Sequence, residues 1–327
     1  MAERRTIRIK FVDYWKRFEA ESYLITQMLR KHYDVVVTDD ADYVFFSAFS
    51  ETHWKTPDRC VKIFHTGENL VPDFNACDYA IGFEWMDYED RYIRFPLYLF
   101  YEKEMLENVL HKHEPPSDWD LHKEKPHFCS FVVSNSSNEV RNRMFRELSS
   151  YRQVDSGGRY MNNVGGAVAD KFAFDSIHKF SICFENGAHN GYTTEKLMEA
   201  FAARTVPIYW GDPTVGRIFN TRAFVNVADY PSMEAVIERV KELDRDDAQY
   251  MEMLREPVFR SDAPTYEQEY QRLEQWLLNI FEQPLEKAWR RNRFFQGRIY
   301  IEHRIILANI SAWKKRMKKI RSLLRWK

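Results

Sequence analysis

Short apolar runs alternate with segments of helical periodicity along most of the chain, and this alternation constrains the fold more than any other feature. In the first third, the apolar runs have the length and composition of buried strands, and two longer segments have helical spacing. The expected strands are 7–12, 34–38, 43–47, 61–65 and 79–83, and the expected helices are 20–32 and 100–111. Strands that alternate with helices predict a parallel sheet with helices on both faces.

A second series of the same kind follows a polar, proline-rich segment at 114–126, EPPSDWDLHKEKP, which is the best candidate for a linker. Its expected strands are 128–133, 180–184, 206–210 and 224–227, and its expected helices are 139–150, 194–204 and 232–243. The chain of 327 residues exceeds the comfortable size of one hydrophobic core. We therefore predict two α/β domains, at 1–124 and 125–283, facing each other across a cleft at the carboxyl ends of their sheets.

Composition excludes several other classes of protein. Apolar residues make up 44% and aromatic residues 16% of the chain, which is too apolar for a disordered protein. The cysteines stand far apart in the sequence and lack the spacings of zinc or iron–sulfur sites. We therefore expect them to be free thiols in a reducing compartment. No signal-peptide core and no apolar run of about eighteen residues is present, so we expect neither secretion by a signal peptide nor a membrane span.

The stretch FENGAHNGYTTEK, at 184–196, places polar side chains where an apolar strand ends and a helix begins. Glu185, Asn186, Glu195 and Lys196 stand at these joints, although a strand–helix–strand unit needs none of them to fold. Lys196 falls in the first helical turn, where a cation opposes the helix dipole at a cost of about 0.3 to 1 kcal/mol. A diphosphate at the helix N-terminus removes this conflict, and the alternative is that Lys196 turns into solvent.

A second cation has the same position after another strand of this series. Arg141 begins a helix after the Ser/Asn-rich turn SNSSNEV, and its planar guanidinium can hold a phosphate through two hydrogen bonds. Taken alone, Arg141 is more often a solvated surface charge, but with Lys196 it could clamp one diphosphate. Lys179, just before the strand 180–184, is a further candidate donor contact with a weaker case.

A carboxylate stands on the first expected domain at the corresponding edge. Glu68 belongs to the loop TGEN after the strand 61–65, so it lies at the carboxyl end of that strand and faces the expected cleft. A lone glutamate in a loop is ordinarily a solvated charge. A functional assignment of Glu68 therefore needs support from outside the loop itself.

Three segments of the chain resemble a known family. FENGAHNGYTTEKLMEAFAARTVPIYWGDP is similar to the signature of the α1,3/4-fucosyltransferases, glycosyltransferase family 10, whose pattern F-E-N, Y-x-T-E-K and V-P-[IV]-Y-W-G-x-P is filled at nearly every fixed position. HTGEN with DYAIGFEWMDYEDRYIRFPLY resembles the acceptor domain of bacterial members, and FVVSNSSNEVRNRMF resembles the start of their donor domain. The likeness spans about residues 65–226. Such an ordered set is far more specific than a short glycine motif.

The resemblance implies a GT-B architecture of two Rossmann-like domains, the first binding the acceptor sugar and the second GDP-fucose. It implies that Glu68 is the general base of an inverting displacement and that Arg141 and Lys196 hold the diphosphate. The positions that match donor contacts are Asn186, Tyr192 and Glu195. Of these, Glu195 is expected near the ribose or the fucose, and we count it with Glu68 as catalytic.

The reaction implied by the resemblance is α1,3-fucosyl transfer from GDP-β-L-fucose to a glycan that contains galactose and N-acetylglucosamine. Preorganised cations stabilise the departing GDP, and a carboxylate takes the proton of the attacking hydroxyl, so no metal or other cofactor is expected. Inversion of the β-linked donor yields an α-linkage. A different nucleotide-sugar transferase on the same fold, an α1,4 specificity and a glucose acceptor stay open as alternatives.

The C-terminal segment 284–327 differs from the rest of the chain, because it carries 14 Lys and Arg against 2 acidic residues. Its last part has apolar and basic residues on mostly opposite faces of an expected helix. The apolar residues are Ile306, Ile310, Trp313, Met317, Ile320 and Leu324, and the basic ones are Lys314, Lys315, Lys318, Lys319 and Arg325. Such a helix suits an anionic membrane surface. Nucleic acid is the competing target, and packing onto the body is the third possibility.

We favour the membrane, since bacterial members of the family resemble this chain in their basic amphipathic ends. The expected location is therefore cytoplasmic, at the inner leaflet of the cell membrane, with no nucleic acid as partner. The rival from a different class is a non-catalytic protein that uses the basic segment to bind nucleic acid or membrane.

Overall fold

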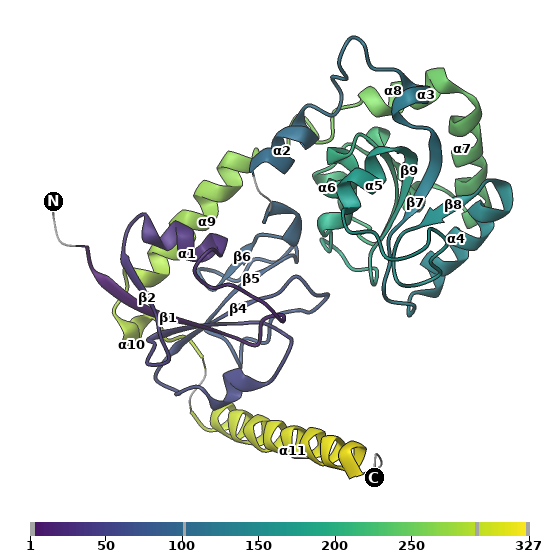
Figure 1. Cartoon of the computed structure of the whole chain (residues 1–327). Coiled ribbons are helices and arrows are strands. Elements are labelled where there is room, and N and C mark those ends of the chain that lie inside the picture. Colours follow the sequence, from purple (N-terminus) through teal and green to yellow (C-terminus); the bar gives the residue numbers. More distant parts are fainter. Residues whose placement is uncertain (1–3, 101–102, 292–293, 325–327) are drawn as a thin grey trace. The chain divides into compact units, whose positions relative to one another are not determined.

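The computed structural model describes residues 4–100, 103–291 and 294–324, which form two compact units. Unit 1 comprises Met1–Gly82, Met86–Phe95 and Glu267–Lys327, and unit 2 comprises Phe83–Trp85 and Pro96–Tyr266. Figure 1 shows a separate sheet in each unit. The chain thus enters unit 2 and returns to unit 1 near its C-terminal end.

The sheet of unit 1 has six strands in the order β2–β1–β3–β4–β5–β6, and every neighbouring pair is parallel. The strands are β1 (Thr6–Val12), β2 (Asp34–Val37), β3 (Tyr43–Phe46), β4 (Val61–His65), β5 (Tyr79–Gly82) and β6 (Tyr92–Arg94). The strands β3, β4 and β5 are buried along their whole length, as in a sheet covered on both faces. Because the strand order reverses between β1 and β3, their carboxyl ends form the switch point at which such sheets bind ligands.

Helices cover both faces of this sheet, and they come from the two ends of the chain. On one face, Tyr43 packs against Phe281 of α9 (Tyr266–Phe281), with ring centroids 4.2 Å apart, and Figure 1 shows α1 (Leu24–Arg30) near α9. On the other face, Val44 belongs to an apolar cluster that contains Ala308 of α11 (Gln296–Leu324). The first half of α11 is therefore part of the core of unit 1.

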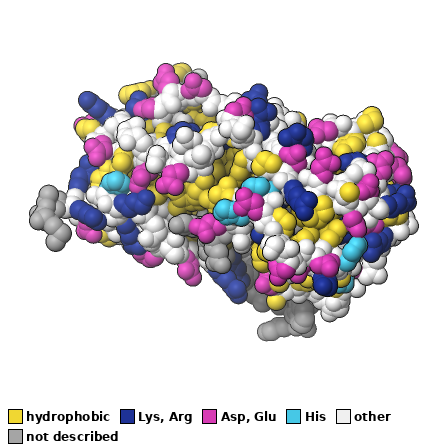
Figure 2. Space-filling view, turned by 90° about the horizontal axis from the view of Figure 1, so that it is seen from above, with side chains coloured by type: hydrophobic (Ala, Val, Ile, Leu, Met, Phe, Trp, Pro, Cys, Tyr) yellow, Lys and Arg dark blue, Asp and Glu magenta, His cyan; other side chains and the backbone are white. Residues whose placement is uncertain are grey.

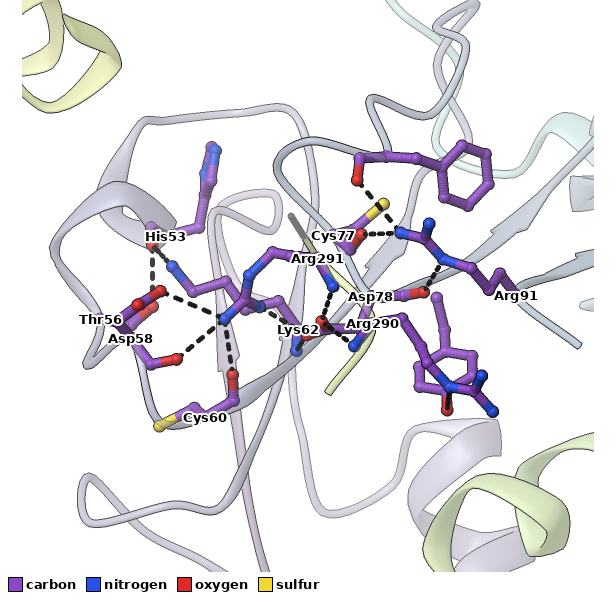
Figure 3. Close-up of polar contacts among 12 residues, drawn as sticks. His53, Thr56, Asp58, Cys60, Lys62, Cys77, Asp78, Arg91, Arg290 and Arg291 are labelled. Atoms are coloured by element: carbon purple, nitrogen blue, oxygen red, sulfur yellow. Dashed lines mark hydrogen bonds and ion pairs between the residues drawn. The ribbon is translucent and has the colours of Figure 1, made fainter. Parts of the chain in front are cut away.

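A buried ion pair fixes the returning C-terminal segment to the sheet. The carboxylate of Asp78 accepts hydrogen bonds from the backbone N–H groups of Arg290 and Arg291, at 2.8 and 2.7 Å, and from the guanidinium of Arg291 at 2.5 Å. The same carboxylate also accepts a hydrogen bond from the backbone N–H of Lys62, at 2.7 Å (Figure 3). The side chains of Asp78 and Arg291 are almost fully buried, so each charge depends on the other.

Replacement of Asp78 by alanine is expected to lower the free energy of unfolding of unit 1 by about 3–5 kcal/mol, because the Arg291 guanidinium would stay buried without its partner. Urea denaturation followed by tryptophan fluorescence measures this loss. Asp40→Ala is the control, since Asp40 pairs with Arg8 and Arg59 at the exposed surface and such pairs contribute about 1 kcal/mol or less. Equal losses in the two variants would contradict the role given to Asp78.

The sheet of unit 2 has five parallel strands in the order β11–β10–β9–β7–β8. The strands are β7 (His127–Phe131), β8 (Val154–Ser156), β9 (His178–Phe184), β10 (Val206–Trp210) and β11 (Val225–Asn226). Figure 1 shows α4 and α7 on one side of the sheet and α5 and α6 on the other. The helices here are α2 (Lys103–Leu110), α3 (Leu121–Glu124), α4 (Glu139–Tyr151), α5 (Lys171–Ser176), α6 (Glu195–Ala202), α7 (Met233–Arg245) and α8 (Asp247–Arg255). The strand order reverses between β7 and β9, which is the switch point of this sheet.

The expectation of two parallel α/β domains with a C-terminal helix is confirmed. Every strand expected from the sequence is present, with ends shifted by a few residues. Two edge strands, β6 and β8, were not expected, because three residues carry too little periodicity to distinguish a strand from a turn. The helices α3, α5, α8 and α9 and the short α10 (Leu285–Ala288) were also not expected from the sequence.

The boundaries between the units differ from the expected ones at 124/125 and 283/284. The helix α2 and the polar segment 114–126 belong to unit 2, whereas α9 belongs to unit 1 because its apolar side covers the first sheet. The segment 284–327 is not a separate tail in its first half, since Arg291 is buried in unit 1 and α11 packs there through Ala308.

Candidate functional site

The polar residues singled out on the second half of the sequence gather at the carboxyl edge of the unit 2 sheet. Arg141 lies in the first turn of α4, which follows β7, and Asn186 follows β9. The two side chains meet at the β7–β9 switch point, where Arg141 Nη1 donates a hydrogen bond to Asn186 Oδ1 at 3.3 Å. The strand order therefore brings together residues that are 45 positions apart in the chain.

The carboxylate of Glu185 organises the start of α6. It is fully buried, and it accepts hydrogen bonds from the backbone N–H of Thr194 at 2.8 Å and from the Thr194 hydroxyl at 2.7 Å. It also forms an ion pair with Lys196 Nζ at 2.9 Å. Thr194 occupies the N-cap position of α6 without capping through its own side chain, because Glu185 satisfies the helix N-terminus instead.

This network accounts for the lysine in the first turn of α6. Lys196 Nζ contacts Glu185, the Thr194 hydroxyl at 2.8 Å and Glu195 Oε1 at 3.0 Å, so its charge is balanced within the chain. Burial alone would lower the pKa of Lys196, but the carboxylates of Glu185 and Glu195 raise it above its ordinary value. The alternative of a lysine turned into solvent is wrong, and the helix dipole is offset by a protein carboxylate.

Arg141 retains hydrogen-bonding capacity in the structure. Its side chain is buried, its Nη2 donates to the backbone carbonyl of Asn135 at 2.6 Å, and burial lowers its pKa. A guanidinium carries five N–H donors, and Nε of Arg141 has no hydrogen-bond partner within residues 4–100, 103–291 and 294–324. The side-chain oxygen of Asn138 caps α4 by accepting a hydrogen bond from the backbone N–H of Arg141 at 3.1 Å. The side-chain amide of Asn138 donates to the backbone carbonyl of Glu185 at 2.8 Å. The loops after β7 and β9 are thereby tied together beneath the guanidinium.

Tyr192 and Glu195 occupy the same loop and helix start with different exposure. Tyr192 is buried and packs against the ring of Phe83, with centroids 5.0 Å apart. Its neighbour Gly191 has φ of +82°, and an added Cβ would meet the backbone carbonyl of Phe83, so only glycine fits there. The side chain of Glu195 is more open than that of Glu185, and it forms an ion pair with Lys196 at 3.0 Å.

Lys179 does not join these residues. It stands at the amino end of β9, about 16 Å from Phe184 at the usual rise per residue. Its ammonium contacts the backbone carbonyl of Asp244 at 3.0 Å and the carboxylate of Asp247 at 3.3 Å, and it lies over the ring of Tyr250. The expected donor contact of Lys179 is therefore not supported, since the side chain anchors α7 and α8 at the opposite edge of the sheet.

Glu68 lies at the carboxyl edge of the unit 1 sheet, in the loop after β4. Its backbone N–H donates to the Thr66 hydroxyl at 3.1 Å, and its side chain is half-buried. At the β1–β3 switch point of this sheet, Trp15 and Phe49 are 42% and 48% exposed, with ring centroids 6.4 Å apart. Exposed aromatic rings are suited to the apolar faces of a sugar. Sequence reasoning missed both rings because nothing local distinguishes them from core aromatics.

The structure has two doubly wound parallel α/β units, and one of them gathers cations at its switch point. This combination is typical of transferases that are built from two Rossmann-like domains. Family models match both units. Residues 9–101 match the "Alpha-(1,3)-fucosyltransferase FucT N-terminal domain", and residues 122–273 match "Glycosyltransferase family 10 (fucosyltransferase) C-term". The chain belongs to glycosyltransferase family 10, the fucosyltransferases.

Individual relatives agree with this assignment. The chain is 37% identical over 233 residues to the α1,3-fucosyltransferase FucT of Helicobacter pylori, covering 63% of this chain and 49% of that protein. It is 33% identical over 132 residues to α1,3-fucosyltransferase 4 of Bos taurus, covering 38% of this chain and 33% of that protein. The chain thus spans about half or less of the length of these curated relatives.

Solved structures are similar over most of the chain. A crystal structure of an α1,3-fucosyltransferase with GDP-fucose aligns with a TM-score of 0.71 and 30% identity, covering 86% of this chain and 93% of that one. A second α1,3-fucosyltransferase structure aligns with a TM-score of 0.75 and 29% identity, covering 89% of this chain and 93% of that one.

Within the described part of the chain, no helix combines the length and the apolar character that crossing a membrane requires.

Proposed function

We propose that this protein transfers L-fucose from GDP-fucose to a hydroxyl of a glycan in α1,3 linkage, with inversion at the fucose carbon. The observation that carries the proposal is the meeting of Arg141, Asn186 and the Lys196 network at the β7–β9 switch point, where doubly wound sheets bind nucleotides. Support comes from the relatives named α1,3-fucosyltransferases and from the similar structure determined with GDP-fucose.

Unit 2 is proposed to hold the donor. Arg141, whose buried Nε has no partner in the described part of the chain, is proposed to donate to diphosphate oxygens once its side chain shifts, and Lys196 adds a second positive charge. The ammonium of Lys196 contacts oxygens of Glu185, Thr194 and Glu195, so a phosphate oxygen must replace one of them. Glu195 is the replaceable partner because it is the more exposed carboxylate, whereas Glu185 stays buried. Its displacement frees Glu195 to accept hydrogen bonds from hydroxyls of the ribose or the fucose. Asn186 and Tyr192 complete the proposed donor contacts.

Unit 1 is proposed to hold the acceptor and to supply the base. Glu68 takes the proton from the acceptor hydroxyl as that oxygen attacks C1 of fucose. At the same time, Arg141 and Lys196 stabilise the charge that develops on departing GDP, so the proposed reaction calls for no metal. The aromatic pair Trp15 and Phe49 contacts an acceptor that contains galactose and N-acetylglucosamine.

A donor panel tests this function. The purified protein is incubated with GDP-fucose, GDP-mannose, a UDP-sugar and a CMP-sugar, each with N-acetyllactosamine and with the isomeric type 1 disaccharide. We expect transfer from GDP-fucose alone, with linkage analysis showing fucose on O3 of N-acetylglucosamine. Transfer only from another nucleotide sugar would reject GDP-fucose as the donor. Fucose found on O4 would show α1,4 instead of α1,3 specificity.

The distal half of α11 is proposed to bind an anionic membrane at the cytoplasmic leaflet. Ile310 and Trp313 are 43% and 62% exposed, and the basic residues Lys314 and Lys315 directly follow Trp313. Arg325, expected on the basic side, lies outside the described residues. On the face shown in Figure 2, acidic and basic side chains are intermixed over the body of the molecule, unlike the run of basic residues in α11.

Deletion of residues 309–327 is expected to abolish binding to phosphatidylglycerol vesicles and to leave kcat on a water-soluble disaccharide acceptor within about twofold. The cut follows Ala308 because earlier residues of α11 belong to the core of unit 1. Vesicle sedimentation and a transfer assay measure the two effects, and phosphatidylcholine vesicles are the control for charge. If the shortened chain still binds the vesicles, this segment is not the membrane-binding element. If it loses turnover on the soluble acceptor, catalysis depends on this segment and the second expectation is wrong.

A further inference from the structure

A cluster of two histidines and an aspartate lies at the amino edge of the unit 2 sheet, away from the candidate donor site. His127 begins β7, His178 begins β9, and Asp155 belongs to the edge strand β8 between α4 and α5 in the chain. His127 Nδ1 and His178 Nε2 lie 3.0 and 3.1 Å from the same carboxylate oxygen of Asp155. The three ligand atoms all fall within 4.8 Å of one another.

The hydrogen-bond partners of His178 require a proton or a metal ion between its ring and Asp155. Its Nδ1 lies 2.7 Å from the backbone carbonyl of Phe174, which can only accept, so Nδ1 must carry the hydrogen. In a neutral ring, Nε2 then presents a lone pair to the Asp155 oxygen, which also carries lone pairs. Two facing acceptors at 3.1 Å repel each other unless a proton or a metal ion lies between them.

A proton between His178 and Asp155 would join only two atoms of this cluster. A metal ion would join all three ligand atoms, which lie within 4.8 Å of one another.

We propose that His127, Asp155 and His178 form a binding site for a divalent metal ion of the zinc type. Two imidazole nitrogens and one carboxylate oxygen are ligands that zinc prefers, and tetrahedral coordination at about 2.0–2.1 Å places ligand atoms about 3.3 Å apart. The two nitrogen–oxygen separations of 3.0 and 3.1 Å are close to this spacing, and the two ring nitrogens lie within 4.8 Å of each other, so ligation requires the imidazoles to turn toward a shared ion. The Nδ1–H of His178 bound to a backbone carbonyl is the outer contact that orients a metal-binding histidine.

The expected role of the metal is to join three strands. β8 is an edge strand of three residues, paired only to β7 in the sheet order, and the ion would connect it to both β7 and β9. The side chain of His127 is 49% exposed, so the ion can enter from solvent and a water molecule can take the fourth position. The site lies at the opposite edge of the sheet from Arg141 and Lys196, so its occupation is independent of the proposed transfer chemistry.

The test uses the full chain with any histidine tag removed and stripped of metal by dialysis against a chelator. We expect one Zn²⁺ to bind per chain in isothermal titration calorimetry, and Co²⁺ at the same site to show the intense visible absorption of tetrahedral coordination. Zinc at about one hundred times its Kd is expected to raise the Tm of unit 2 by about 5 to 10 °C.

Two variants make the test specific. His127→Gln removes a half-exposed ligand and is expected to weaken zinc binding at least tenfold and to abolish the tetrahedral Co²⁺ spectrum. His122→Gln is the matched control, because His122 is an exposed histidine of α3 paired with one carboxylate, and it is expected to bind zinc like the unchanged protein. Equal affinity in the two variants would overturn the site. Absence of zinc binding, with both ring nitrogens of His178 protonated in ¹⁵N NMR spectra, would show that a proton occupies the position instead.

Discussion

Replacement of Glu68 by glutamine is expected to lower kcat for fucosyl transfer about 10²- to 10⁴-fold, the range that a general base contributes. Glutamine has nearly the same size and keeps the loop contacts, which run through the backbone N–H of residue 68 and the Thr66 hydroxyl. Its amide cannot take a proton from the acceptor hydroxyl. The measurement is steady-state kinetics with GDP-fucose and N-acetyllactosamine, together with the Kd for GDP.

The Kd for GDP should be unchanged in this variant, because Glu68 belongs to unit 1 and the proposed diphosphate ligands belong to unit 2. Glu19→Gln is the matched control, since Glu19 is an exposed glutamate on another loop of unit 1, and it should keep normal turnover. Near-normal kcat in Glu68→Gln would remove the general-base assignment and leave the donor site unaffected.

Replacement of Lys196 by alanine is expected to have two separable effects. The buried carboxylate of Glu185 loses its ion-pair partner at 2.9 Å, so the free energy of unfolding of unit 2 should fall by about 3–5 kcal/mol. The Kd for GDP should rise about 10- to 100-fold, since a charge-assisted hydrogen bond to the diphosphate contributes about 1.5–3 kcal/mol. Urea denaturation and calorimetry measure the two quantities.

The double variant Lys196→Ala/Glu185→Gln separates structure from donor binding. Without the charge on residue 185, no unpaired carboxylate stays buried, and stability should return to within about 1–2 kcal/mol of the original value. The Kd for GDP should stay high, because the ammonium is still absent. If GDP affinity returns together with stability, Lys196 serves only the fold and the proposed diphosphate contact is rejected.

Lys196 illustrates what sequence reasoning could and could not reach. The conflict between its charge and the helix dipole was visible in the sequence, and it led us to expect a diphosphate at the start of α6, which stays a proposal. In the structure, the charge is balanced by the carboxylate of Glu185, which is 11 residues earlier at the end of β9 and which we did not predict as its partner. The pattern F-E-N contained this signal, since a glutamate directly after a fully buried strand needs a partner.

The sequence by itself determined the class of fold, the polar joints at strand ends and the basic C-terminal segment, because each depends on residues that are neighbours in the chain. Periodicity of apolar residues is enough to separate strands from helices, and the family signature lies in one continuous stretch. Only the tertiary structure decided that Lys179 anchors α7 and α8, that Asp78 holds Arg291, and that His127, Asp155 and His178 converge. These partners come from distant strands, and strand order and register, which no local pattern records, decide which side chains share an edge of a sheet.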